Sequence, residues 1–422
     1  SVRHEASSRF IGAEKPWGQF PSISAGWRIS EESFMENVSF ISYLKIRAGY
    51  GVTGTAPDEL FLGVPRFTYD GYFLIDGEWV PTLKPATNYN PYLRWEVKKE
   101  QNYGVDFAFL KGRVNGSVDY YIRRSHGMIY NYPVPVPPNL VDIMTANVGV
   151  MENKGVEIMV SADVVRTDKF QWQTTATYSY NKNLLVSLSN EIYSLENDFF
   201  DVGFAGVPIQ TTTHRVEVGQ PIGNFHTNKV VGVNEAGEWM YLDTLGNATT
   251  AKNLEDKMVV GNGLPKAFAS WNNSFRYGNF DLNISMRGAF GYQILNFFRM
   301  YYEVPEYPLF NKLASAYDPV VIDGVEYPVI TNGTPVINSY YVEDGDYWKI
   351  DNITLGYTIP TARVKNIQSL RVYGSVLNGF IITNYTGMDP EVSTEGLYPG
   401  NDNRDKYPTT RTFTVGINVV FN

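Results

Sequence analysis

The chain has 422 residues, a formal net charge of −9 and no cysteine. An acidic chain is a poor binder of nucleic acid, because phosphate neutralisation needs clustered Lys and Arg. The missing cysteines exclude disulfides, thiolate zinc sites, iron–sulfur clusters and cysteine nucleophiles. No apolar run reaches the roughly 18 residues of a membrane-spanning helix, and 15% aromatic residues beside 37 Gly favour a β-rich protein.

The chain starts with Ser1-Val2-Arg3-His4, which lacks the basic and apolar regions of a signal peptide. We therefore expect a processed or longer N-terminal region upstream.

Two-residue alternation of apolar and polar side chains is the dominant pattern. Val114, Val118 and Ile122 fall on one face of their segment, and Asn115 and Asp119 fall on the other. The pattern predicts about twelve strands, many of them as long as the roughly 9–11 residues that cross a bilayer. In chain order they are expected at 2–11, 19–29, 42–54, 93–110, 113–130, 154–166, 170–189, 267–277, 279–293, 346–359, 368–384 and 409–421.

Short and long links alternate along the chain. Tight turns are expected near 111–112, 167–169 and 277–279, the first link near 12–18 is compact, and the links at 30–41 and 360–367 are intermediate. The long links are 55–92, 131–153, 190–266, 294–345 and 385–408. Transmembrane β-barrels pair short periplasmic turns with long extracellular loops, whereas a soluble sandwich has no reason to sort its links in this way.

This polarity predicts that the C-terminus is periplasmic. Trp27, Trp172 and Phe421 would then lie at the periplasmic interface, where membrane proteins carry an aromatic girdle. The alternative is that they are core residues of a soluble sheet.

Seven stretches in this order resemble the C-terminal barrel region of SusC/RagA-type TonB-dependent outer-membrane transporters. They are FPSISAGWRI at 20–29, LKIRAGYGVTG at 44–54, LRWE at 93–96 leading to NYGVDF at 102–107, NVG through NKGVE at 147–157, DYWKI at 346–350 before LGY at 355–357, NYTGMDPE at 384–391, and YPTTR at 407–411.

The resemblance implies an all-β, antiparallel, up-and-down barrel of about twenty-two strands, of which 1–422 would supply the last twelve as one domain. It places a plug domain, a TonB-contacting segment and the first strands outside this chain, which would be a fragment, split product or partial chain. A closed twelve-stranded barrel is the alternative. The chain departs from the family in ending on Asn422 after Phe421, because members tend to end on an aromatic residue.

Catalytic motifs are scarce, and we expect neither an enzyme nor a cofactor or metal site. The four histidines, His4, His126, His214 and His226, have no metal-ligand spacing, and the last two are interpreted as solvated loop residues. The acidic runs 343–346 and 401–405 do not fit a calcium loop and are interpreted as solvated.

Aromatic residues in the long links are the candidates for contact with substrate or with a lipoprotein lid, because aromatic faces stack on sugar rings and also pack against proteins. They are Tyr69, Tyr72, Phe73 and Trp79 in 55–92, and Tyr301, Tyr302, Tyr307, Phe310, Tyr340 and Tyr341 in 294–345. Polar-face residues are the candidates for lining the lumen: Arg113, Asn115, Asp119, Asp281, Asn283 and Arg287.

The resemblance implies a nutrient importer of the bacterial outer membrane that works with a SusD-like surface lipoprotein and is energised through TonB. Oligosaccharide is the expected substrate and peptide the alternative. The sequence leaves open a soluble secreted carbohydrate-binding or hydrolytic β-protein and a plain porin without a plug.

Overall fold

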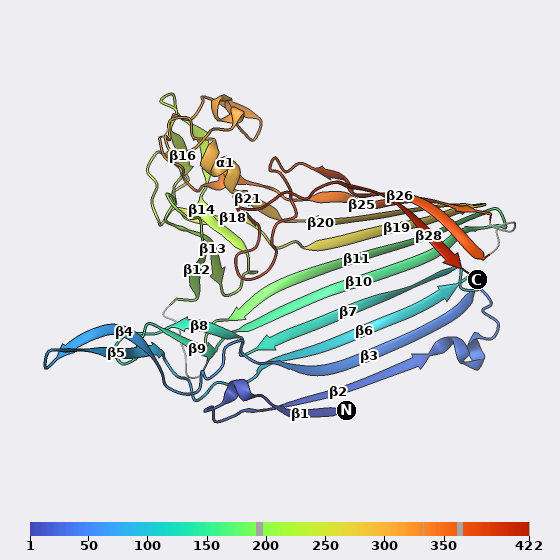
Figure 1. The fold of residues 1–422 in the computed structure, drawn as a ribbon, viewed down its shortest axis with the longest axis horizontal. Helices are drawn as coiled ribbons and strands as arrows, with labels where there is room; N and C mark the ends of the chain where they lie inside the picture. The colour runs from blue at the N-terminus through green and yellow to red at the C-terminus, as the bar shows by residue number, and fades with distance from the viewer. Residues whose placement is uncertain (191–196, 332, 361–365, 422) are drawn as a thin grey trace.

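A twelve-stranded antiparallel sheet dominates the computed structural model, in which each strand pairs with the strands before and after it among the twelve (Figure 1). The structure describes residues 1–190, 197–331, 333–360 and 366–421. The expected link at 360–367 and the terminal Asn422 lie largely or wholly outside these ranges. The strands of the sheet are β1 (Val2–Ala6), β2 (Trp17–Arg28), β3 (Ile41–Thr55), β6 (Glu96–Phe109), β7 (Val114–His126), β10 (Val150–Arg166), β11 (Phe170–Ser187), β19 (Ala267–Tyr277), β20 (Phe280–Phe290), β25 (Tyr347–Ile359), β26 (Ile367–Thr383) and β28 (Thr412–Phe421).

The sheet confirms all twelve expected strands, with corrections at their ends. The first ends at Ala6 and not at 11, because Ser8–Phe10 forms a 3-10 turn. The strand expected over 113–130 stops at His126, before Gly127 takes a φ of +61°. Its last residues form the separate strand β8 (Ile129–Pro133), which pairs with β9 (Ile143–Asn147).

The links sort by length between the two ends of the sheet. The turns after β6, β10 and β19 lie at the same end as the C-terminus, whereas the long connections gather at the opposite end (Figure 1). Trp27, Trp172 and Phe421 lie near strand ends on the short-turn side. Ring pairs such as Trp172–Phe275, with centroids 5.6 Å apart, and Phe280–Tyr357, 4.6 Å apart, add to an aromatic band there.

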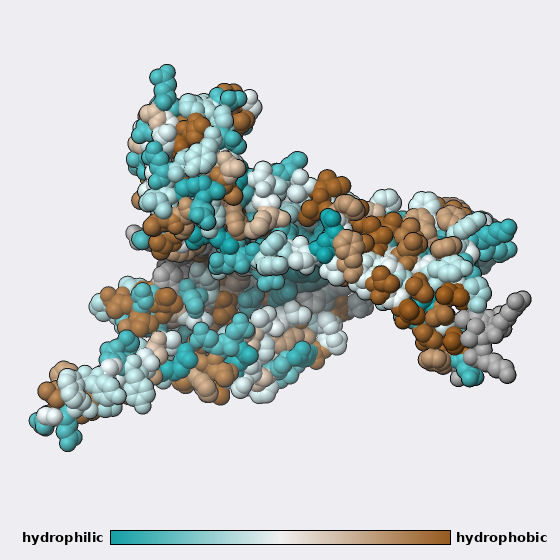
Figure 2. Space-filling model, turned by 45° about the horizontal axis from the view of Figure 1, so that its top comes forward, coloured by the Kyte–Doolittle hydropathy of each residue, from teal (hydrophilic) through white to brown (hydrophobic). Residues whose placement is uncertain are grey.

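The sheet has one polar and one apolar face. Directly opposite residues share a face, and the polar face runs from β7 to β20 through the pairs Asp119–Glu157, Glu157–Ser179, Ser179–Phe268 and Phe268–Ala289. The opposite face exposes apolar side chains such as Ile23, Val118 and Ile417. Figure 2 shows hydrophobic residues gathered over the strands.

The long links expected as loops are folded, which the sequence did not indicate. Residues 197–266, 291–346 and 384–411, here called the cap, fold together at the long-link end as far as the structure describes them. Their elements are β12 (Phe199–Phe204), β13 (Thr212–Glu217), β14 (Asn224–Asn228), β15 (Val230–Val233), β16 (Trp239–Leu242), β17 (Ala248–Thr249), β18 (Lys257–Asn262), β21 (Gln293–Asn296), α1 (Phe297–Tyr302), β22 (Val320–Ile322), β23 (Val325–Tyr327), β24 (Val342–Asp344) and β27 (Asn401–Asp402), with 3-10 turns at Ala314–Tyr317 and Ser339–Tyr341.

The cap has a hydrophobic core of its own. Phe225, Trp239, Leu295, Met300 and Ile337 are buried together in it, although they come from different links. The link 55–92 is separate from the cap and forms a two-stranded hairpin, β4 (Arg66–Ile75) and β5 (Glu78–Thr87), which projects beyond the other strands (Figure 1). Within the described ranges, no helix is both long and apolar enough to cross a membrane.

Candidate functional site

An ion cluster crosses the polar face over β3, β6 and β7. Arg47 Nε donates to both carboxylate oxygens of Asp106 at 3.0 and 2.9 Å, and Arg47 Nη2 donates to Asp119 Oδ2 at 2.8 Å. Gly104 lies in register between Arg47 and Asp119, and a Cβ there would come within 2.6 Å of the guanidinium carbon. The glycine therefore leaves the space through which this ion pair spans β6.

A second ion pair on this face uses the same arrangement. Arg371 donates to the two carboxylate oxygens of Asp281 at 2.9 and 2.5 Å. A Cβ on Gly356 of the intervening strand would lie 2.3 Å from Arg371 Nη2. Each arginine thus reaches across a glycine to a carboxylate on the next strand but one; Arg371 and Asp281 balance in charge, whereas Arg47 with Asp106 and Asp119 keeps one net negative charge.

A third ion cluster joins the cap to the sheet. Glu391 of the cap accepts hydrogen bonds from Lys349 Nζ at 2.5 Å and from the Tyr347 hydroxyl at 3.3 Å. Arg287 Nη1 approaches its other carboxylate oxygen at 2.5 Å. Lys349 is only 3% exposed, so Glu391 is the close counter-ion of a buried ammonium and holds the cap segment 384–411 against β20 and β25.

Uncharged side chains fill the polar face between these clusters. Neighbouring strands exchange hydrogen bonds in the pairs Ser161–Thr175, Thr177–Ser270, Asn181–Asn153 and Asn183–Asn153. The face therefore presents hydroxyls and amides, with most of its charged side chains in ion pairs and Glu157 exposed, which suits hydrogen bonding to a polar solute.

The strands carry the predicted lumen-lining residues on the polar face, with one exception: Asn115, Asp119, Asp281, Asn283 and Arg287 lie on it. Arg113 lies in the turn before β7, where its guanidinium donates to the backbone carbonyls of Asp163 and Val164. Contact of these residues with a solute stays a prediction.

The aromatic residues predicted in 294–345 divide by burial. Tyr301, Tyr307 and Tyr341 are buried in the cap, and the Tyr301 hydroxyl donates to Ala205 O at 2.6 Å. These rings have almost no surface to offer a ligand in this structure. Burial raises the pKa of Tyr341 well above its usual range.

Tyr302 and Tyr340 keep part of their surface. The Tyr340 ring lies 4.7 Å from the guanidinium of Arg299, which donates to Glu303 at 2.9 Å and to Glu343 at 2.9 Å. Contact with substrate or lid stays a prediction for these two tyrosines and for the hairpin residues.

The β4–β5 hairpin exposes apolar side chains on both faces, and one face carries most of its aromatic residues. Its register puts Tyr69 opposite Leu83, Tyr72 opposite Pro81 and Leu74 opposite Trp79, with Phe67 opposite Pro85 further along the same face. Tyr69, Tyr72 and Trp79 are 77%, 68% and 69% exposed, so this face has no cover within the described chain. The other face carries the Lys84–Asp70 ion pair at 2.6 Å.

The interpretation of His214 and His226 as solvated is wrong. His214 is 1% exposed and contacts Thr213 Oγ1 at 2.7 Å and Pro399 O at 2.8 Å through its two ring nitrogens. Burial lowers the pKa of His214 to about 4, and burial together with nearby Arg215 lowers the pKa of His226 to about 4. Both histidines are packing residues of the cap.

The interpretation of the acidic runs as solvated is wrong for Glu343 and Asp402, whereas Asp344 and Asp405 are exposed as expected. Glu343 accepts from Arg299 and from the Thr386 amide at 2.8 Å, and buried Asp402 accepts from the Tyr385 hydroxyl at 2.6 Å. In the described ranges, no group of three or more His, Cys, Asp or Glu is placed to hold a metal ion.

Sequence reasoning missed Lys349 and Glu391. Alternation through Tyr347-Trp348-Lys349 offered a signal for Lys349, because it puts the lysine on the face of Arg287, its partner in register. No local pattern marks Glu391, which reaches the sheet from a long link.

The chain resembles known proteins over its whole length. The family model for TonB dependent receptor-like β-barrels matches residues 1–379. TonB-dependent receptor SusC of Bacteroides thetaiotaomicron is 29% identical over 442 residues, covering 100% of this chain and 42% of that protein. TonB-dependent receptor P39 of Formosa agariphila is 29% identical over 491 residues, covering 100% of this chain and 44% of that protein.

The fold agrees with a solved transporter. A structure of the RagAB peptide transporter superposes with a TM-score of 0.84 at 21% identity, covering 99% of this chain and 45% of that chain. The chain therefore spans less than half the length of the relatives it matches. It belongs to the TonB dependent receptor-like β-barrel family, and the relatives and the solved structure that it matches include proteins of SusC/RagA type.

Proposed function

We propose that this chain forms the C-terminal barrel wall of an active nutrient importer that is energised through TonB. The observation that carries the proposal is the two-faced twelve-stranded sheet, whose polar face would line the lumen and whose apolar face would meet lipid. Strands β1 and β28 each have one neighbour within the described sheet. Because unpaired strand edges are not tolerated in lipid, further strands of the protein would close the barrel.

The proposed orientation puts the cap and the hairpin outside the cell and the C-terminus in the periplasm. The sorting of short and long links between the two ends supports this orientation, since barrels of this class keep their short turns periplasmic. The aromatic band at the short-turn end supports it as well, because such bands lie at membrane interfaces.

Oligosaccharide is the proposed substrate. The amides and hydroxyls of the polar face support a cargo rich in hydroxyl groups. Peptide is the second candidate, because the solved structure with a TM-score of 0.84 is that of a peptide transporter.

Uptake by the full-length protein tests this function. Cells that carry the transporter and its lipoprotein should import a fluorescent oligosaccharide only when TonB is present, and the protein should migrate as a compact band on unboiled gels. A labelled peptide in the same cells tests the second candidate. Equal uptake of both labelled cargoes with and without TonB, or a protein soluble without detergent, would refute the proposal.

The hairpin face would carry part of the contact with a SusD-like lipoprotein lid. Each strand of the hairpin has 10 residues, so it reaches on the order of 30 Å past its base. It projects past the long-link end of the strands (Figure 1), which in the proposed orientation is away from the bilayer. The prolines of β5 interrupt its edge, so a partner would cover the face and would not extend the sheet.

Replacing Tyr69, Tyr72 and Trp79 together by serine should weaken lid binding by about 30-fold or more, because buried aromatic anchors dominate interface energies. Titration of the purified lipoprotein against the transporter in detergent measures the loss. Ile75→Ser is the matched control, since Ile75 is 48% exposed on the opposite face of the same strand as Tyr69 and Tyr72. An equal loss in the control, or none in the triple variant, would show that the face does not meet the lid.

A further inference from the structure

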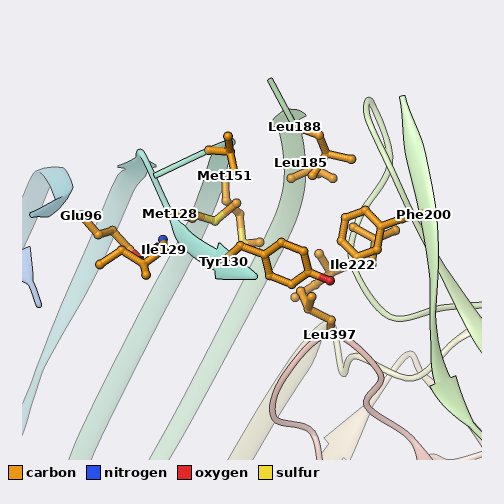
Figure 3. Close-up of a pocket in the computed structure, with 12 residues that line it drawn as sticks. Glu96, Met128, Ile129, Tyr130, Met151, Leu185, Leu188, Phe200, Ile222 and Leu397 are labelled. Atoms are coloured by element: carbon orange, nitrogen blue, oxygen red, sulfur yellow. Dashed lines mark hydrogen bonds between the residues drawn. The ribbon is translucent and has the colours of Figure 1, made fainter. Parts of the chain in front are cut away.

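An apolar cavity lies at the long-link end of the sheet, and none of the predicted sites includes it. Its volume is about 240 Å³, and it is partly enclosed. Figure 3 shows Tyr130, Phe200 and Leu397 facing it from three separate links, with Leu185 and Leu188 beside them. Its lining residues are Glu96, Met128, Ile129, Tyr130, Val148, Met151, Leu185, Leu188, Phe200, Val216, Ile222 and Leu397.

The cavity lies where a solute would pass between the cap and the polar face. Met151 of β10 and Leu185 of β11 are partners in register, and both continue the polar face, because Asn153 and Asn183 two residues further along are also partners. The polar face thus changes from amides to apolar side chains at this end.

The cavity walls are well fixed. Leu185, Leu188 and Val216 form a buried cluster with Phe200, Ile222 and Leu397 packed against it. The rings of Tyr130 and Phe200 stack with centroids 5.1 Å apart. A preformed cavity with packed walls costs little to organise when a ligand enters.

The chemistry of the lining selects against sugar hydroxyls. Among the described lining residues Glu96 is the one that carries a charge, and its carboxylate already accepts from the Ile129 amide at 3.3 Å. A hydroxyl placed among methionine, leucine and phenylalanine would lose its hydrogen bonds to water without replacement. An apolar cavity of about 150 Å³ in another protein stays dry and binds benzene, so this larger one has room for a phenyl or isobutyl group.

We propose that this cavity is a recognition subsite for one apolar group carried by the cargo, about the size of a leucine or phenylalanine side chain. The inference rests on the proposed import function and names a chemical group within its cargo. The group has two sources, a side chain of a peptide or an aryl substituent of a glycan, and the experiment separates them.

The test compares two pairs of probes on the full-length transporter in detergent. One pair is tetraglycine and Gly-Leu-Gly-Gly, and the other is maltotriose and its phenyl glycoside. The apolar group should raise affinity by roughly ten- to a hundred-fold in at least one pair, as expected for burying a side chain of this size. The pair that responds identifies the source. Equal affinities within both pairs would overturn the proposal.

Variants locate the effect in the cavity. Leu188→Trp fills the space and should abolish the gain, whereas Val207→Trp, an exposed position of the same link, should preserve it. Leu188→Ala enlarges the cavity and should favour a naphthyl over a phenyl group, which keeps the test valid if the tryptophan variant folds poorly. A gain that persists in Leu188→Trp protein with an intact compact gel band would overturn the proposal. Loss of TonB-dependent uptake with the gain intact would instead count against the import function alone.

Discussion

Replacing Glu391 by alanine should lower the free energy of unfolding by about 3–5 kcal/mol, because the change leaves a buried ammonium without its counter-ion. Lys349 is 3% exposed, and Glu391 Oε2 lies 2.5 Å from its Nζ. The variant also removes one of the two ion-pair partners of Arg287, whose Nη1 lies 2.5 Å from Glu391 Oε1 and whose Nε lies 3.3 Å from Asp351 Oδ1. Denaturant titration of the full-length protein in detergent, followed by loss of the compact gel band, measures the change.

Glu395→Ala is the matched control, because Glu395 is an exposed glutamate of the same cap segment. It should change stability little, as surface substitutions usually do. Adding Lys349→Met to Glu391→Ala should recover most of the loss, since the uncompensated charge is then gone. A Glu391→Ala protein as stable as the Glu395→Ala protein would contradict this account of the cluster.

The strands of the sheet could be predicted from the sequence because most of them repeat the same two-residue alternation of apolar and polar side chains over many residues. Residues 280–287 of β20 alternate apolar and polar side chains without exception, and a slip by one residue would turn every side chain to the wrong face. The cap follows no such rule. Asn224–Asn228 of β14 is buried at all five positions, so its sequence has no period to detect.

The sequence predicted which face of the sheet most of the lumen-lining candidates lie on, but it did not predict which residue each one pairs with. Alternation assigns Asp281 to the polar face, yet its partner Arg371 lies 90 residues further along the chain. Likewise, His214 contacts the carbonyl of Pro399, 185 residues away. Contacts between residues so far apart in the sequence depend on how the long links fold together. Composition and residue spacing do not reveal this folding.

Acidification should destabilise the cap, because His214 is buried in its neutral form. Nε2 lies 2.8 Å from Pro399 O and therefore carries the proton, while Nδ1 accepts from Thr213. Burial lowers the pKa of His214 from 6.5 to about 4. Between pH 6.5 and about pH 4 the unfolded state binds more protons than the folded state. The stability contributed by neutral His214 is therefore fully present above pH 6.5 and is lost as the pH falls toward 4. The loss is about 3 kcal/mol.

Hydrogen exchange at pH 7.5 and 4.5, corrected for intrinsic rates, measures this effect separately in the cap and in the strands of the sheet. When the pH is lowered from 7.5 to 4.5, the amide protection of β13 and β14 should decrease more than that of β7 or β20. The cap has its own core and can therefore open without the sheet. His214→Gln should remove about half of the difference because glutamine cannot titrate, and His226, whose pKa is also about 4, accounts for a similar share. His4→Gln, at an exposed position, should leave it unchanged. If the cap lost the same protection in the His214→Gln protein, the carboxylates of the ion clusters would have to account for the acid sensitivity.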